Sequence, residues 1–213
     1  MKRYGRRRRY GRRKPKKGLA SKTYVRKAIG KIKANIETKY LSTSEALTVD
    51  YNGVIRKLSG TIQGGADYQR VGDQITCRSI TVRFAPTNTA DTFNICRMIL
   101  FRWTQDDNVT SPYASSILDS TGYTTAPLSG WFFDAMRAKK FKVLYDKSFD
   151  TNADLSVASN FPRKVHIKLN SKVNYFNATA NGTGNIYMLL ISDSSIAPHP
   201  IINYASQLFY VDC

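Results

Sequence analysis

Acidic residues are almost absent from the first 39 positions of this 213-residue chain. That stretch holds 17 Lys and Arg residues against one acid, Glu37, whereas residues 40–213 hold 16 cations and 14 acids. The formal charge of +18 therefore divides into +16 on residues 1–39 and +2 on the rest. A cationic arm beside a nearly neutral body indicates a polyanionic partner, because a generally basic protein would spread its charge over the whole chain.

Cysteine and long apolar runs are also scarce. Cys77, Cys96 and Cys213 are too few and too scattered for a disulfide framework or a zinc site. Cys77 and Cys96 lie inside apolar runs, which predicts buried thiols. No run of 18 apolar residues occurs, so we expect no membrane span and no membrane partner, and the cationic start lacks the apolar segment of a signal peptide.

The residue sets of catalysis are missing as well. Of the two histidines, His166 alternates with apolar residues on an expected strand and His199 lies between two prolines. Neither has a serine or cysteine in a recognisable nucleophile context, and the sequence has no P-loop, dinucleotide fingerprint or HExxH motif. Asp106 and Asp107 are a weak candidate for Ca²⁺, with a solvated turn as the favoured alternative. We therefore expect no enzyme, no cofactor and no bound metal.

The arm itself reads RYGRRRRYGRRKPKKG over residues 3–18. Arginine pairs with phosphate through two parallel hydrogen bonds, Tyr4 and Tyr10 can stack on unpaired bases, and glycine keeps the backbone loose. This combination predicts sequence-independent binding of single-stranded nucleic acid; a nuclear localisation signal or a solvated tail are the alternatives. The expected binding residues of the arm are Lys2, Arg3, Tyr4, Arg6, Arg7, Arg8, Arg9, Tyr10, Arg12, Arg13, Lys14, Lys16 and Lys17. Those expected to serve nuclear import are Arg6, Arg7, Arg8, Arg9, Arg12, Arg13, Lys14, Lys16 and Lys17.

Residues 21–40 predict a basic amphipathic helix. Aliphatic side chains recur at spacings of four, three and four, which defines one helical face. Ser21 or Thr23 can cap the start, and Gly30 weakens the middle, so we expect the helix to form against a partner. A membrane-surface helix is the disfavoured alternative, because the apolar face carries no Trp or Phe. The cations expected to support nucleic-acid binding are Lys22, Arg26, Lys27, Lys31 and Lys33.

From Ala46 onward the pattern predicts an all-β domain of about eight short antiparallel strands, a two-sheet sandwich or a barrel. Residues 93–104 and 185–192 are apolar on both faces, as in core strands. In residues 73–84 the apolar set switches from odd to even positions, which indicates a bulge or burial on both faces. A long insertion follows at residues 105–140, and Ser129 can cap a short helix near residues 131–139. The other expected strands lie within 46–65 and at 141–149, 163–176 and 203–212.

The chain resembles the capsid proteins of small circular single-stranded DNA viruses, the circoviruses and their Rep-encoding relatives. The Arg/Tyr-rich arm opens the chain, and TIQGGADYQRVGDQITCRSITVRF (61–84) is similar to a stretch that recurs in those capsids and in the capsids of small plant satellite RNA viruses. KFKVLYDKSF (140–149) and GNIYMLLISDSS (184–195) resemble later strands of the same family. The regular helix of residues 21–40 is closer to the basic N-terminal helices of the satellite viruses.

The resemblance implies a single eight-stranded antiparallel jelly roll, with residues 1–20 as the nucleic-acid-binding arm, 21–40 as the helix and 41–213 as the shell domain. It also implies a homo-oligomer of about 60 copies in a T=1 icosahedral virion. Circular single-stranded DNA is the expected cargo, with RNA as the alternative, and assembly would then take place in the host nucleus. A cellular nucleic-acid-binding protein with a β-sandwich body is the alternative from another class.

Overall fold

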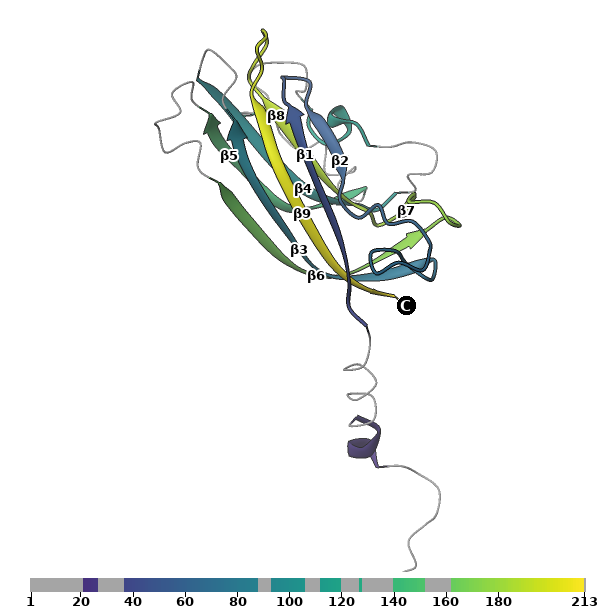
Figure 1. Cartoon of the computed structure of the whole chain (residues 1–213). Helices are drawn as coiled ribbons and strands as arrows, with labels where there is room; N and C mark the ends of the chain where they lie inside the picture. The colour runs from purple at the N-terminus through teal and green to yellow at the C-terminus, as the bar shows by residue number, and fades with distance from the viewer. Residues whose placement is uncertain are drawn as a thin grey trace, which may run out of the picture. The chain divides into compact units, whose positions relative to one another are not determined.

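The computed structural model of the chain describes residues 21–26, 37–87, 93–105, 112–119, 127, 140–151 and 162–212. The chain divides into two compact units, Met1–Ile36 and Glu37–Cys213. Nine β-strands and one short 3₁₀ helix, η1, are described in the second unit (Figure 1). They are β1 (Lys39–Thr48), β2 (Val54–Lys57), β3 (Gln74–Thr87), β4 (Asn94–Trp103), η1 (Ala114–Ser116), β5 (Phe141–Thr151), β6 (Arg163–Tyr175), β7 (Gly182–Thr183), β8 (Ile186–Ser192) and β9 (Ile201–Asp212).

The strands form two antiparallel sheets in the order β1-β9-β3-β6-β7 and β2-β8-β4-β5. Apart from the step from β4 to β5, the eight long strands alternate between the sheets, which is the winding of a jelly roll. The predicted eight-stranded antiparallel jelly roll is thus confirmed. The addition is β7, a two-residue strand that extends the edge of the first sheet beside β6.

The main core lies between the two sheets, where alternate residues of each strand meet. Cys96, Met98 and Leu100 of β4 contribute to this core, while Ile99, Phe101 and Trp103 of the same strand enter a second cluster on the other face of their sheet. Residues of the segment that contains η1 complete the second cluster with Ala114, Ile117 and Leu118. This arrangement explains why β4 and β8 are apolar on both faces, as the sequence predicted.

The switch of apolar positions along β3 has a structural cause. The pairing of β3 with β9 shifts by one residue between Cys77 and Ser79, so Arg78 forms a β-bulge against β9. The pairing with β6 shifts at the same place in the opposite sense, with the extra residue on β6. Because a one-residue slip inverts every side chain, Cys77 on one side of the bulge and Ile80 on the other both point into the core. The bulge that the sequence indicated is confirmed.

Strand β1 begins earlier than expected, inside the segment assigned to the amphipathic helix. Lys39 and Tyr40 pair with Tyr210 and Phe209 of β9. Lys39 lies in a buried position, where its Nζ forms an ion pair with Asp212 at 3.1 Å. Because a lysine occupies this inward position, the start of β1 lacks the alternation of apolar and polar residues that indicates a strand. The short helix expected at residues 131–139 falls outside the described residues.

The loop between β2 and β3 is fastened by a buried arginine. Arg70 is 0% exposed, and its guanidinium donates to the carbonyl oxygens of Gly72, Asn177 and Thr179. The guanidinium also lies 4.4 Å from the ring centroid of Tyr175. Arg70 therefore ties the β2–β3 loop to the loop that follows β6.

Candidate nucleic-acid interface

Two of the predicted binding residues fall in the described part of the predicted helix, residues 21–26. Residues 22–26 are helical, and Ser21 caps this turn because its Oγ accepts a hydrogen bond from the Tyr24 N–H at 3.2 Å. Lys22 and Arg26 are exposed on this turn. The other predicted residues lie outside the described part of the chain: Lys2, Arg3, Tyr4, Arg6, Arg7, Arg8, Arg9, Tyr10, Arg12, Arg13, Lys14, Lys16, Lys17, Lys27, Lys31 and Lys33.

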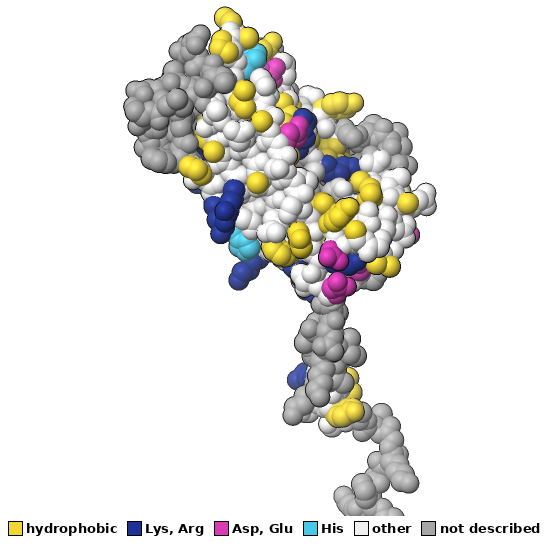
Figure 2. Space-filling view, viewed as in Figure 1, with side chains coloured by type: hydrophobic (Ala, Val, Ile, Leu, Met, Phe, Trp, Pro, Cys, Tyr) yellow, Lys and Arg dark blue, Asp and Glu magenta, His cyan; other side chains and the backbone are white. Residues whose placement is uncertain are grey.

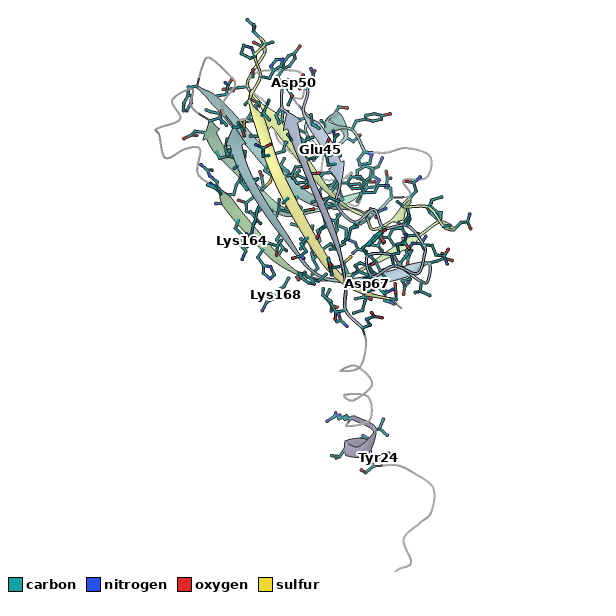
Figure 3. The ribbon with its side chains drawn as sticks, viewed as in Figure 1. Tyr24, Glu45, Asp50, Asp67, Lys164 and Lys168 are labelled. Carbon is teal, nitrogen blue, oxygen red and sulfur yellow. The ribbon has the colours of Figure 1, made fainter. Side chains whose placement is uncertain are left out.

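A second group of cations lies on the body, on the outward surface of the five-stranded sheet. We call it the basic face and define it by Arg83 of β3 with Lys164, His166 and Lys168 of β6, all of which are exposed. Figure 2 shows Lys and Arg side chains gathered with a histidine on one side of the sandwich, and Figure 3 labels Lys164 and Lys168 there. These residues were not predicted from the sequence.

The strand register places these side chains in a regular array. Arg83 pairs with Lys164, Thr81 with His166 and Ser79 with Lys168. Because alternate residues of a strand share a face at about 3.3 Å per residue, the outward side chains of β6 recur about every 7 Å and Lys164 and Lys168 lie about 13 Å apart. The Thr81 hydroxyl and His166 Nδ1 are 2.9 Å apart and form a hydrogen bond that orients the imidazole. The array is therefore a row of positive and hydrogen-bonding groups along one strand pair.

The charges of the basic face are not neutralised within the described residues. Directly opposed like charges destabilise a strand pair, and Arg83 opposite Lys164 is such a pair. The described carboxylates form their ion pairs elsewhere, with Lys39, Arg56, Arg70 and Arg97. The basic face thus presents uncompensated positive charge that an anion could balance.

Glu45 is the only acidic residue of β1, and it does not lie on the side of the sheet that carries the basic face. It accepts hydrogen bonds from Arg56 Nε at 2.8 Å and Nη2 at 2.9 Å, which joins β1 to β2 of the other sheet. These bonds to Arg56 hold the pKa of the Glu45 carboxyl below its usual value. Glu45 is therefore committed to a structural ion pair.

A hollow of about 460 Å³ adjoins the basic face. Small side chains from β1 and β9 line much of it, and Arg83 and Lys164 stand at its margin. The hollow follows from the register, which sets Ser44 and Ala205 in the same cross-strand row as Arg83 and Lys164. Its lining residues are Ser42, Thr43, Ser44, Thr81, Arg83, Lys164, Ala205, Ser206 and Gln207.

Two aromatic residues lie further along the same surface. Tyr40 of β1 pairs with Phe209 of β9, which pairs in turn with Ser79 of β3. Tyr40 is 47% exposed and Phe209 partly exposed, so their rings are available at the surface. Phe209 lies four positions after Ala205 on β9, so the aromatic pair lies about 13 Å from the row of Arg83 and Lys164.

Sequence reasoning missed the basic face because it used only the apolar residues of each strand, which alternate with the outward polar ones. Val165, Ile167, Leu169 and Val173 mark the inward side of β6, and the residues between them were not interpreted. Those outward positions carry lysine or histidine at 164, 166, 168 and 172 and no acid. The charge of the outward positions is the signal that could have found the face, although the pairing with Arg83 could not be read from it.

The structure describes His199 but not the two candidate metal ligands, Asp106 and Asp107. Asp106 and Asp107 lie outside the described residues, and within the described residues no group of three His, Cys, Asp or Glu side chains could hold a metal ion. His199 lies in the β8–β9 loop, with its Nδ1 2.9 Å from the Ser194 hydroxyl. The described ranges also contain no helix long and apolar enough to span a bilayer.

Comparison with known proteins adds a family to this geometry. The sequence model of the family described as "Satellite tobacco necrosis virus coat protein" matches residues 8–213. The capsid protein of Satellite tobacco necrosis virus 1 is 32% identical over 154 residues, which cover 68% of this chain and 71% of that protein.

Two solved viral structures of low sequence identity align with most of the chain. Desmodium yellow mottle tymovirus has a TM-score of 0.40 at 10% identity, with 83% of this chain and 87% of that chain covered. A structure described as "60-mer BFDV Capsid Protein" has a TM-score of 0.35 at 11% identity, with 83% and 92% covered.

Proposed function

Because the chain belongs to the satellite tobacco necrosis virus coat protein family and is thus a viral capsid protein, we propose that about 60 copies close into a shell around a single-stranded nucleic acid. The observation that carries the cargo half of this proposal is the charge division. Residues 1–39 hold +16 of the net +18, so the arm is the segment equipped to neutralise an enclosed polyanion.

The shell half of the proposal is supported by the family. The jelly roll that the structure describes within residues 37–212 has a hydrophobic core of its own between its two sheets. A subunit that folds independently can meet identical copies through its loops and edges in a closed, symmetric assembly.

The charge of the arm sets the size of the cargo. With +16 on residues 1–39, about 60 copies supply roughly 960 positive charges, and nucleic acid that keeps part of its own counterions can exceed this about two-fold. We therefore propose a genome of about 1,000–2,000 nucleotides. The contact is mainly to phosphate, so binding is independent of sequence and weakens as salt rises.

The family favours RNA as the cargo, in line with the satellite virus alternative raised by the sequence. Circular single-stranded DNA is the second candidate, favoured by the Arg/Tyr-rich arm of residues 3–13. Nuclear import through the basic residues of 6–17 belongs to this second candidate, because it presupposes replication in the nucleus. Extracted cargo that is digested by RNase or by DNase decides between the two.

The experiment that tests the arm compares particles of the full chain with particles of a variant in which Arg6–Arg9 are replaced by Gln. The charge argument predicts that the variant encloses less nucleic acid, because four of the 16 net charges are lost from each arm. The ratio of absorbance at 260 nm to that at 280 nm measures the content. A variant with unchanged content would refute the proposed role of the arm.

A further inference from the structure

We propose that the hollow and the exposed Tyr40 beyond it form a second binding site for single-stranded nucleic acid, in which Arg83 and Lys164 bind phosphate at the hollow and Tyr40 stacks on a base. This inference rests on the proposed function and extends it from the arm to the body of the subunit. The site is built by four strands that meet only in the folded protein, β1, β9, β3 and β6.

The phosphate contacts follow from the pairing of Arg83 with Lys164. Two cations at opposed positions repel each other in the free subunit, and a phosphate bound between them removes that repulsion. Lys168 adds a further positive charge along β6 and His166 a hydrogen-bonding ring, so a nucleic-acid backbone that passes Arg83 and Lys164 meets further polar groups.

The hollow provides space for a single strand of nucleic acid. Its volume of about 460 Å³ lies in the range of small-molecule sites, and its margin carries the two cations. The wall from β1 and β9 consists of small or neutral polar side chains such as Ser42, Ser44 and Gln207. Hydroxyl and amide groups can bond to any sugar or base edge, so this wall admits a nucleotide without selecting one.

The aromatic pair completes the site. Tyr40 and Phe209 lie about 13 Å from the row of Arg83 and Lys164, so a strand of several nucleotides is required to occupy both positions. A base has an apolar face and stacks on any exposed aromatic ring. The combination of cations, neutral polar wall and aromatic ring favours nucleic acid over a simple polyanion, which would use the cations alone.

The first test is a lysine footprint on the unmutated full chain. Lysines are acylated with and without a 20-nucleotide oligo(U) or oligo(dT), and the modified peptides are quantified by mass spectrometry. We expect Lys164 and Lys168 to be protected several-fold, while Lys142 and Lys147 on β5 of the other sheet react as before. The oligonucleotide that protects these lysines more strongly indicates the preferred nucleic acid. If neither oligonucleotide protects them, the inference is overturned.

The second test measures binding as a function of salt. The double variant Arg83→Gln/Lys164→Gln should lower the slope of log K against log salt by about 1.4, because each phosphate contact on a single strand contributes about 0.7. The variant Lys142→Gln/Lys147→Gln loses the same charge on the other sheet and should leave the slope unchanged. Equal slopes for both double variants would overturn the role of the basic face.

The stacking contact is separated from charge by Tyr40→Leu. The affinity of this variant for the oligonucleotide should fall about 5- to 150-fold, which is the expected effect of losing one stacked base. The salt slope should stay unchanged. Tyr113→Leu is the control, because Tyr113 is also exposed, at 68%, but lies beside η1. Equal affinities of these two variants would remove Tyr40 from the site.

The arm variant keeps this inference apart from the proposed function. If replacement of Arg6–Arg9 by Gln weakens binding while the Arg83/Lys164 variant does not, the arm alone holds the cargo and only the second site is wrong. If the arm variant binds as tightly as the unmutated chain, the proposed function of the arm has failed, whatever the body variants show.

Discussion

Replacing Arg70 by methionine should destabilise the subunit more than any other single loss of a positive charge that we consider. Arg70 is 0% exposed, and its guanidinium is held by Asp73 Oδ1 at 2.9 Å, by the Thr179 carbonyl at 3.0 Å and by the carbonyls of Gly72 and Asn177. Methionine fills a similar apolar volume but donates no hydrogen bond. The substitution therefore leaves the carbonyl acceptors of two loops without their donor.

The size of the effect follows from these contacts. Removing one partner of a buried charged network costs about 3–5 kcal/mol. Asp73 is 66% exposed and regains water, so most of the loss falls on the three carbonyl oxygens, and we expect about 3 kcal/mol, near the lower end of that range. For a domain of this size each kcal/mol lowers the melting temperature by about 2–4 °C, which predicts a fall of about 6–12 °C.

The control is Arg56→Met. Arg56 makes a two-pronged ion pair with Glu45, but the two side chains are 40% and 42% exposed, so its loss should cost about 0–1 kcal/mol. Urea unfolding of the dissociated subunit, followed by far-ultraviolet circular dichroism, measures both variants. If the free energies of unfolding of the two variants differ by less than about 1 kcal/mol, Arg70 does not stabilise the protein by joining the two loops.

Three further predictions concern the thiols, the arm and pH. Cys77 and Cys96 should resist iodoacetamide at pH 8 in the native protein, because both are buried and burial raises the pKa of Cys96 to about 12; rapid alkylation seen by mass spectrometry would contradict this. Replacing Tyr4 and Tyr10 by serine should weaken oligonucleotide binding by about 1–3 kcal/mol per lost stacked base at an unchanged salt slope, and equal binding would reduce both to spacers. The carboxylate of Glu45 has a lowered pKa, so its stabilisation is present above the usual value near 4.5 and is lost as pH falls through the folded-state pKa. Glu45→Gln should therefore destabilise more at pH 7 than at pH 3, and an equal effect at both values would contradict the ion pair.

The fold could be predicted largely because each strand carries its own local pattern. In β3 the exchange of inward positions between Cys77 and Ile80 revealed the bulge, since side chains alternate with a period of two. β1 was placed too late because Lys39 points inward and is neutralised by Asp212, which lies 173 positions further along the chain. No local pattern contains a partner at that distance.

The candidate interface was predictable only for the arm, where charge is concentrated in sequence. The basic face depends on the pairing of β3 with β6, which brings Arg83 beside Lys164 across 81 positions of the chain. The hollow depends additionally on β1 and β9, from opposite ends of the body. Composition places the charge of residues 40–213 near neutrality, and only the sheet order reveals that the cations of β3 and β6 share one surface.

The central claim is that this coat protein closes around a single-stranded nucleic acid held by its own cationic arm. Electron microscopy of the purified full chain, combined with nuclease digestion of the extracted contents, tests it most directly. We predict closed shells about 20 nm across, the size of about 60 packed domains of this volume, that contain a single-stranded nucleic acid of about 1,000–2,000 nucleotides. A chain that stays monomeric or dimeric over a range of salt and pH, or shells that are empty although the arm is intact, would contradict it.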